Sequence, residues 1–171
     1  NEPDVIKDSY KVIGTKDYIN FRLTGQIKTD YSYASGSGVY DLLNWKYSPE
    51  LLAASGLDES LFPEIVAATE IIGELSQEAA ECLGLPQKVK VACGGVDNSC
   101  MALGARNIES GRVYLSLGSS AWIAVSDDMP VLDDISRPFV FTHVIPGMFT
   151  SAVSIFSAGN SFRWLCDNLC P

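Results

Sequence analysis

A short β-rich segment that stops abruptly at two glycines is the strongest constraint on how this chain folds. Residues 89–93 are Val-Lys-Val-Ala-Cys, Gly94 and Gly95 follow, and Asp97 comes just before residues 101–105, which have the apolar pattern of a buried helix. A strand, a glycine turn, an acid and a helix in this order are typical of α/β domains. In open α/β folds the loops at the carboxyl ends of strands line the ligand crevice, so we expect Asp97 to lie at a binding site.

Asp97 has two physically reasonable roles. The two glycines let a ligand approach the backbone, and a carboxylate at a strand end can accept the proton of a bound hydroxyl group. Asp is also a preferred residue at the N-cap of a helix, where it would only stabilise the helix that follows. The residues of this segment alone leave both interpretations open.

Local signals predict the other elements of the first half. A polar cap or a Pro at the start and a Gly at the end predict three short helices, over residues 16–23, 49–55 and 77–83. Residues 26–39 are instead rich in Thr, Ser, Gly and Asp. We expect this polar segment to be an ordered loop and not part of the core.

The second half is predicted to contain two hairpins and a helix. The predicted strands are 112–117 with 121–125, and 139–145 with 148–155, and the helix covers 157–169. Gly118 and Ser119 form the tip of the first hairpin, which offers N–H groups and hydroxyls to phosphate oxygens but is a weak signal alone. Gly159 could bring the backbone close to a nucleotide or simply start the helix. A composition shift near residue 110 divides the chain into 1–110 and 111–171.

Composition and charge argue against several classes of protein. A net charge of −9 with 12 basic residues excludes an electrostatic nucleic-acid footprint, and no apolar run reaches the ~20 residues of a membrane helix. We therefore expect a cytoplasmic protein that binds neither nucleic acid nor a membrane. The five cysteines and one histidine of the chain fit neither a disulfide scaffold nor a metal site, and His143 is expected to be an ordinary strand residue.

A set of motifs in a fixed order gives a further indication. The set consists of Lys16-Asp17-Tyr18, Leu23-Thr24-Gly25, residues 29–35, Tyr40-Asp41, Trp45, Leu61-Phe62-Pro63, residues 72–75, residues 94–98, residues 115–120 and Ala158-Gly159-Asn160 with Trp164-Leu165. Together these motifs resemble the FGGY family of carbohydrate kinases, and the resemblance covers nearly the whole chain. A chance match of single short motifs is common, but a match of so many in order is not.

The resemblance implies part of an actin-like ATPase (ribonuclease H-like) α/β fold, in which two domains surround a cleft. Residues 1–110 would be the C-terminal part of the first domain and residues 111–171 the start of the second. Members of the family are much longer and carry an upstream phosphate-binding hairpin and a downstream adenosine pocket. We therefore expect this chain to be a central segment that is inactive alone.

The resemblance also implies roles for particular residues. Asp97 would be the general base, and Asp97 or Asn98 would hydrogen-bond the sugar. Gly118 and Ser119 would face the transferred phosphate, and Gly159 the nucleotide. Ser119 stands where the family usually has Thr, but the hydroxyl group is retained. The implied cofactors are ATP and Mg²⁺, without a protein metal site.

Within the family, the residues after Asp97 and the segment 34–41 resemble the kinases that convert D-xylulose to D-xylulose 5-phosphate. Phosphorylation of gluconate or another sugar is one alternative, and a noncatalytic sugar-binding module of the same superfamily is a second. An unrelated α/β domain in which Asp97 is only a helix cap is a third. The expected partners are a small-molecule sugar and ATP, and a homodimer is a possible assembly.

Overall fold

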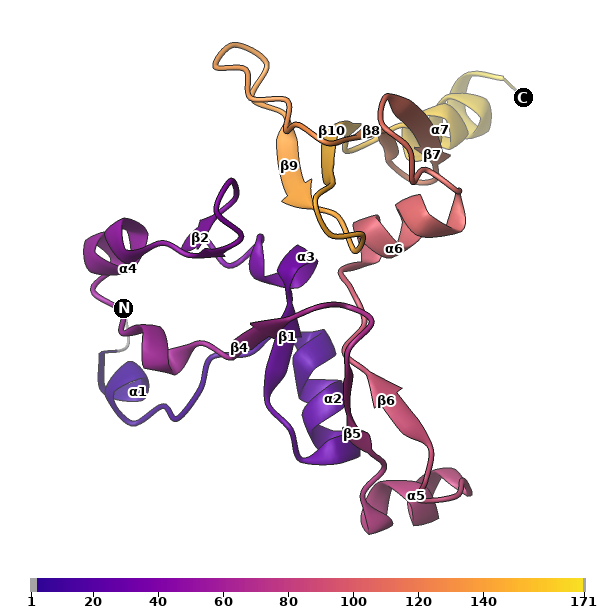
Figure 1. Cartoon of the computed structure of the whole chain (residues 1–171). Coiled ribbons are helices and arrows are strands. Elements are labelled where there is room, and N and C mark those ends of the chain that lie inside the picture. Colours follow the sequence, from indigo (N-terminus) through magenta and orange to yellow (C-terminus); the bar gives the residue numbers. More distant parts are fainter. Residues whose placement is uncertain (1–2, 171) are drawn as a thin grey trace. The chain divides into compact units, whose positions relative to one another are not determined.

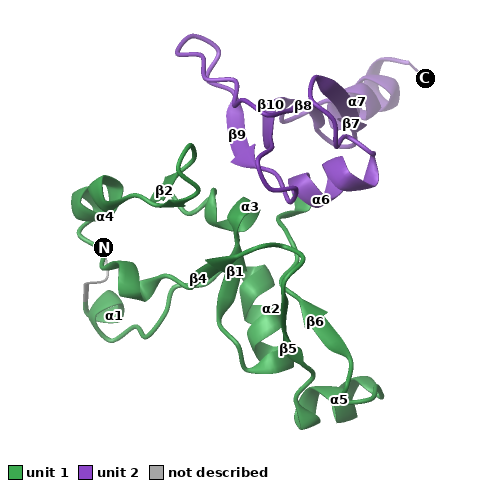
Figure 2. Ribbon diagram, in the orientation of Figure 1, with its two compact units in different colours: residues 1–97 green, residues 98–171 purple. Residues whose placement is uncertain are grey.

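The computed structural model describes residues 3–170 and divides the chain into two compact units (Figures 1 and 2). Unit 1 is Asn1–Asp97 and unit 2 is Asn98–Pro171. Both contain helices and strands, which confirms the α/β class expected from the sequence. The expectation that this chain is a central segment concerns its two ends. Residues 1, 2 and 171 at these ends lie outside the described residues.

Unit 1 consists of short helices and small sheets (Figure 1). Its helices are α1 (Pro3–Lys7), α2 (Thr15–Thr24), α3 (Tyr31–Ala34), α4 (Pro49–Ser55), a 3₁₀ turn (Glu59–Leu61) and α5 (Gln77–Leu83). Its strands are β1 (Lys28–Asp30), β2 (Tyr40–Asp41), β3 (Lys46–Tyr47), β4 (Glu64–Val66), β5 (Ile71–Glu74) and β6 (Lys90–Ala92). β1 pairs with β4 in parallel, whereas β2 with β3 and β5 with β6 are antiparallel pairs.

The three helices predicted in this unit are confirmed, because their end signals are local. The Ser48 hydroxyl accepts the Leu51 N–H at 3.2 Å at the start of α4, and the Ser76 hydroxyl accepts the Ala79 N–H at 3.1 Å at the start of α5. α2 ends at Gly25, whose φ of 74° is in the left-handed region that favours glycine.

The prediction of a polar loop over residues 26–39 was wrong for residues 28–34. These residues form β1 and α3, and three of their polar side chains, Thr29, Asp30 and Ser32, are at most 2% exposed. Asp30 is buried because its carboxylate caps α3, accepting the N–H groups of Ser32 and Tyr33. A polar segment can therefore belong to the interior when other groups satisfy its hydrogen bonds.

Unit 2 is built on one antiparallel sheet with the strand order β7-β8-β10-β9. The strands are β7 (Arg112–Leu117), β8 (Ala121–Asp127), β9 (Phe139–Thr142) and β10 (Phe149–Ile155), and the sheet is followed by α7 (Gly159–Leu169). β7 pairs with β8, and β9 with β10, so both predicted hairpins are confirmed. The helix predicted over 157–169 is also present.

The helix α6 (Asp97–Gly104) packs against one face of this sheet. Ala102, which is fully buried, forms a small core with Tyr114, Ala124 and Ala152. Residues 101–105 were expected to form a buried helix, but Met101 and Leu103 are more than 40% exposed. The expectation of burial was wrong because only one side of α6 faces the sheet in unit 2.

Candidate active site

The glycine turn after β6 is fixed by backbone hydrogen bonds within unit 1. The Cys93 N–H donates to the Glu70 carbonyl oxygen, and the Gly94 N–H donates to the Ala68 carbonyl oxygen, both at 2.9 Å. Gly94 has a φ of 72°, which a residue with a side chain rarely adopts. The glycine is therefore needed for the chain to leave β6 in this direction.

Asp97 follows this turn and is exposed. It is the first residue of α6, and the residue that precedes the helix is Val96. Among residues 3–170, β6 pairs only with β5, in antiparallel orientation, so the turn and not the edge of a parallel sheet brings the carboxylate to the surface.

Asn98 is held in unit 2 through its backbone. The Tyr114 hydroxyl donates to the Asn98 carbonyl oxygen at 3.2 Å and accepts the Trp122 indole N–H at 3.0 Å. The next residue, Ser99, is fully buried and donates to the Thr142 carbonyl oxygen at 3.1 Å. The first turn of α6 is thus tied to the sheet, and the half-buried Asn98 side chain could contact a ligand.

The phosphate-binding candidates of unit 2 lie together. The Gly159 N–H donates to the Gly118 carbonyl oxygen at 3.1 Å, and the N–H groups of Ala158 and Asn160 donate to the Ser119 carbonyl oxygen at 2.9 and 3.2 Å. A Cβ atom on Gly159 would lie only 2.2 Å from the Gly118 oxygen. Gly159 is therefore required for the start of α7 to approach the hairpin tip.

This contact changes what the hairpin can offer to a phosphate group. The N–H groups of Gly118 and Gly159 are both engaged within the chain, the former with the Ser120 carbonyl oxygen at 2.8 Å. These two N–H groups are not available as donors in this conformation. Ser119 is exposed at the tip, so its hydroxyl is the group best suited to bind a phosphate oxygen.

A buried ionic cluster contacts the glycine turn at Cys93. No role was predicted for this cluster from the sequence. The Lys16 ammonium group of α2 lies 2.8 Å from Asp17 Oδ1 and 3.2 Å from Asp30 Oδ1, and it donates to the Cys93 carbonyl oxygen at 3.2 Å. Burial lowers the pKa of Lys16, but the carboxylates of Asp17 and Asp30 outweigh it, so the pKa is raised overall. Lys16 is therefore charged at neutral pH.

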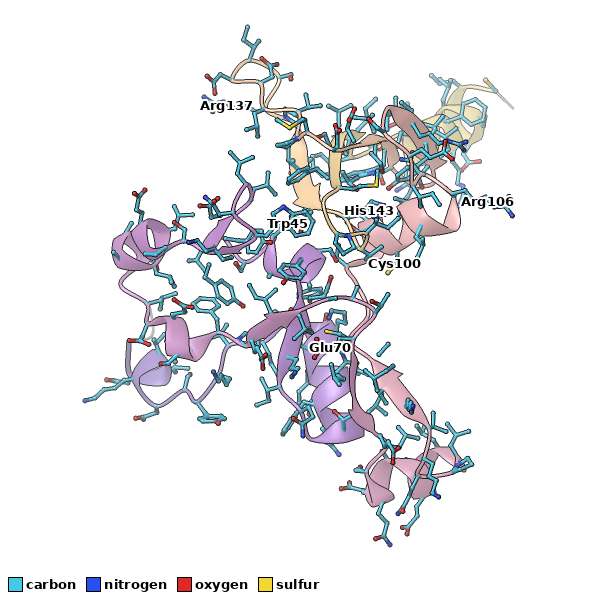
Figure 3. All side chains as sticks on the ribbon, viewed as in Figure 1. Trp45, Glu70, Cys100, Arg106, Arg137 and His143 are labelled. Carbon is cyan, nitrogen blue, oxygen red and sulfur yellow. The ribbon has the colours of Figure 1, made fainter. Side chains whose placement is uncertain are left out.

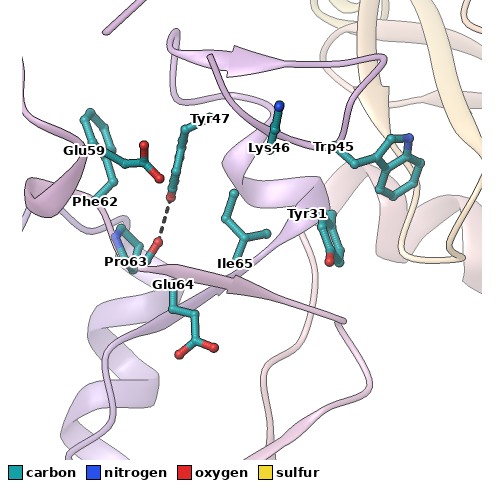
Figure 4. Close-up of a pocket in the computed structure, with 9 residues that line it drawn as sticks. All are labelled: Tyr31, Trp45, Lys46, Tyr47, Glu59, Phe62, Pro63, Glu64 and Ile65. Carbon is teal, nitrogen blue, oxygen red and sulfur yellow. Dashed lines mark hydrogen bonds between the residues drawn. The ribbon is translucent and has the colours of Figure 1, made fainter. Parts of the chain in front are cut away.

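Unit 1 also has an open aromatic pocket of about 330 Å³ (Figure 4). Its lining residues are Tyr31, Trp45, Lys46, Tyr47, Glu59, Phe62, Pro63, Glu64 and Ile65. The Tyr47 hydroxyl donates to the Pro63 carbonyl oxygen at 3.0 Å, and burial raises the pKa of Tyr47. None of the residues predicted to bind sugar or nucleotide lines this pocket, so we do not assign it to the active site.

Among residues 3–170, no helix is long and apolar enough to cross a membrane. No group of three or more His, Cys, Asp or Glu side chains in this part of the chain could hold a metal ion.

Solved structures of sugar kinases share this fold. A ligand-bound xylulose kinase from Lactobacillus acidophilus matches with a TM-score of 0.92 at 27% identity, over 99% of this chain and 34% of that one. A gluconate kinase from the same organism matches with a TM-score of 0.93, again at 27% identity and with the same coverage. The chain therefore has part of the actin-like ATPase fold of carbohydrate kinases.

Sequence comparison is more specific. The model of the FGGY family of carbohydrate kinases, N-terminal domain, matches residues 1–104. A xylulose kinase from Lactococcus lactis is 33% identical over 164 residues, which are 96% of this chain and 32% of that protein. The chain belongs to the FGGY family of carbohydrate kinases. It spans about a third of the length of the curated relatives that it matches.

Proposed function

We propose that this chain is the central segment of an ATP-dependent sugar kinase, with Asp97 as the general base. The observation that carries the proposal is the exposed carboxylate at the start of α6, directly after a hydrogen-bonded glycine turn, in a chain of this family. A helix cap alone would not require the preceding turn to be fixed by hydrogen bonds. We also propose that residues 1–110 complete the first domain of the kinase and that residues 111–171 begin the second.

In the proposed reaction, Asp97 accepts the proton of a sugar hydroxyl while the hydroxyl oxygen attacks the terminal phosphorus of ATP. The bond from phosphorus to the bridging oxygen breaks, and ADP leaves with the electron pair of that bond. Asn98 hydrogen-bonds the sugar, and the Ser119 hydroxyl donates to an oxygen of the transferred phosphoryl group. The contact between Gly118 and Gly159 holds the hairpin tip against α7.

Mg²⁺ would neutralise phosphate charge as a complex with the nucleotide, as in other phosphoryl-transfer enzymes. Because residues 3–170 contain no cluster of metal ligands, we assign no residue of this chain to the ion and derive no step through it. We assign nucleotide binding by this chain to the hairpin tip and the start of α7.

D-Xylulose is the substrate that we propose first, with D-xylulose 5-phosphate as the product. The similarity to xylulose kinases in both sequence and structure supports it. D-Gluconate is the second candidate, because the gluconate kinase from Lactobacillus acidophilus matches the fold equally well. A noncatalytic sugar-binding module is less well supported, since such a protein would not need a carboxylate at position 97.

ADP release by a full-length protein containing this chain, measured by a coupled assay with each sugar, tests the proposal. We expect the kcat/KM for D-xylulose to exceed that for D-gluconate by at least about tenfold, a difference of ~1.4 kcal/mol in transition-state stabilisation. A preference for D-gluconate would make gluconate the substrate. Calorimetric sugar binding without ADP release would instead identify a binding module and overturn the proposed activity.

A further inference from the structure

We propose that the buried Ser32 is a positioning residue for Asp97, which it serves by holding the turn that precedes the carboxylate. The inference rests on the proposed function of Asp97 as the general base. Ser32 is on α3, far from Asp97 in sequence, and it is fully buried. It therefore acts through the backbone and has no access to a substrate.

The hydrogen bonds of Ser32 run from a fixed carboxylate to the residue before Asp97. The Val96 N–H donates to Ser32 Oγ at 2.9 Å. The same hydroxyl donates to Asp30 Oδ2, which also accepts the Ser32 N–H at 2.9 Å. Because the Ser32 hydroxyl donates its hydrogen to Asp30, an oxygen lone pair of Ser32 is left to accept the Val96 N–H.

A second set of hydrogen bonds holds the other end of the turn. The Cys93 carbonyl oxygen accepts from Asn20 Nδ2 at 2.7 Å and from Lys16 Nζ at 3.2 Å. Lys16 in turn lies 3.2 Å from Asp30 Oδ1, so the two oxygens of one buried carboxylate serve both ends of the turn. Residues 93–96 are thereby clamped between α2 and α3.

Such a clamp is needed because the turn contains two glycines. Gly94 and Gly95 allow many backbone conformations, and without side-chain hydrogen bonds the direction of the following residue would vary. A displacement of about 1 Å at a reacting group can cost ~100-fold in rate. The clamp fixes the position of Val96, and Asp97 is the next residue.

The test is Ser32→Ala in the full-length protein, which removes the acceptor of the Val96 N–H. We expect kcat to fall about tenfold and the KM for the sugar to change less than about twofold, because the substrate is bound by other groups. Ser48→Ala is the matched control. It also removes a buried hydroxyl that accepts a backbone N–H, but at the start of α4, and it should leave kcat within about twofold of wild type.

A double-mutant cycle with Asp97→Asn separates positioning from a general loss of stability. If Ser32 acts through Asp97, Ser32→Ala should lower the residual rate of Asp97→Asn by less than about twofold, because the group that it positions is no longer a base. An equal fall in both backgrounds, or no fall in the wild-type background, would overturn the inference. If Ser32→Ala does not fold, Asn20→Ala, which removes a donor to the Cys93 carbonyl oxygen, goes through the same cycle with the same criteria.

The failure of the inference and the failure of the proposed function look different. If Asp97→Asn alone retains the wild-type rate, Asp97 is not the base and the proposed function fails. If Asp97→Asn abolishes the rate and Ser32→Ala does not change it, only the positioning role fails. Amide hydrogen exchange at Val96 provides an independent measurement on this chain, and we expect faster exchange in Ser32→Ala and unchanged exchange in Ser48→Ala.

Discussion

At the scale of single residues, Lys16 forms ion pairs with two buried carboxylates of unit 1. Its two partners, Asp17 and Asp30, are at most 1% exposed, so both carboxylates of the cluster are removed from solvent. The neighbouring Cys93 thiol is also buried, which raises its pKa to about 11 and keeps it neutral at pH 7. The positive charge of Lys16 thus offsets the desolvation cost of burying two carboxylates.

Lys16→Met should therefore be strongly destabilising. We expect the free energy of unfolding to fall by about 3–5 kcal/mol, since the variant leaves buried carboxylates without their partner. Lys28→Met is the control, because Lys28 pairs with the more exposed carboxylates of Glu64 and Glu70 and should have a much smaller effect. Urea unfolding of this chain measures both. An equal loss of unfolding free energy in the two variants would show that the buried cluster contributes no more to stability than the exposed ion pairs of Lys28.

His143 is the one histidine of the chain and gives a pH dependence that can be assigned to it. It is almost fully buried in unit 2 (labelled in Figure 3), and its Nδ1 atom accepts the Ile145 N–H at 2.9 Å. Burial lowers its pKa below the usual value of 6.5. Protonation would place a charge in the interior and a proton on the accepting nitrogen.

The sign of the effect follows from that lowered pKa. The unfolded chain binds the proton more readily than the folded chain, so the stability contributed by neutral His143 is complete above pH 6.5 and is lost as the pH falls through the lowered folded pKa. We expect the free energy of unfolding to be lower at pH 5 than at pH 7. The difference should be smaller in His143→Gln, and an equal pH dependence in both proteins would contradict the assignment.

At the scale of elements, the sequence predicted those parts whose signals are local. Ser48 with Gly56, and Ser76 with Gly84, mark the two ends of α4 and α5, and the caps lie within a few residues of the groups that they bind. The segment that became β1 and α3 was missed for the opposite reason. Asp30 pairs with Lys16 and Ser32 accepts the Val96 N–H, and because both partners are distant in sequence, no local pattern predicts that these side chains are buried.

The sheet of unit 2 has an apolar face that is exposed in this chain. Leu115, Ile123 and Val153 lie opposite one another on β7, β8 and β10 and are each about half exposed. A face of this kind on an isolated chain promotes association. The alternation of buried and exposed residues along these strands follows from α6 covering only the other face.

We therefore expect the 171-residue chain to self-associate through this face and Ile123→Lys to weaken that association. A charge at the centre of the face must be desolvated on contact, and we expect the association constant to fall by about tenfold or more. Ile135→Lys is the control, because Ile135 is 95% exposed and lies outside the sheet. Sedimentation velocity at several concentrations measures both variants, and a similar change in the two would exclude the sheet face as the contact.

At the scale of the whole molecule, the chain covers about a third of the kinases that it resembles. The order of its motifs was sufficient to predict the family, and the hairpin tip and helix start expected to meet a nucleotide do lie together in unit 2. The clamp around the glycine turn was not predicted, because it depends on side chains from α2 and α3 that only the fold brings to residues 93–96. The roles of Asp97 and Ser119 stay predictions.

The chain alone should not phosphorylate a sugar. Phosphoryl transfer requires both reactants to be positioned together, and we propose that this chain supplies only part of the active site. ADP release with ATP across a panel of pentuloses and hexoses should not exceed that of an Asp97→Ala control. Turnover well above the control would show that the chain contains more of the active site than we propose.

The central claim is that Asp97 is the general base, and Asp97→Asn in the full-length protein tests it most directly. Asn has the size of Asp and can still hydrogen-bond a sugar, but it cannot accept a proton. In single-turnover phosphorylation we expect the rate to fall about 10²- to 10⁴-fold, while the sugar dissociation constant from calorimetry changes far less. If Asp97 only capped α6, Asn would serve nearly as well, and a variant that keeps more than about half of the wild-type rate would contradict the account.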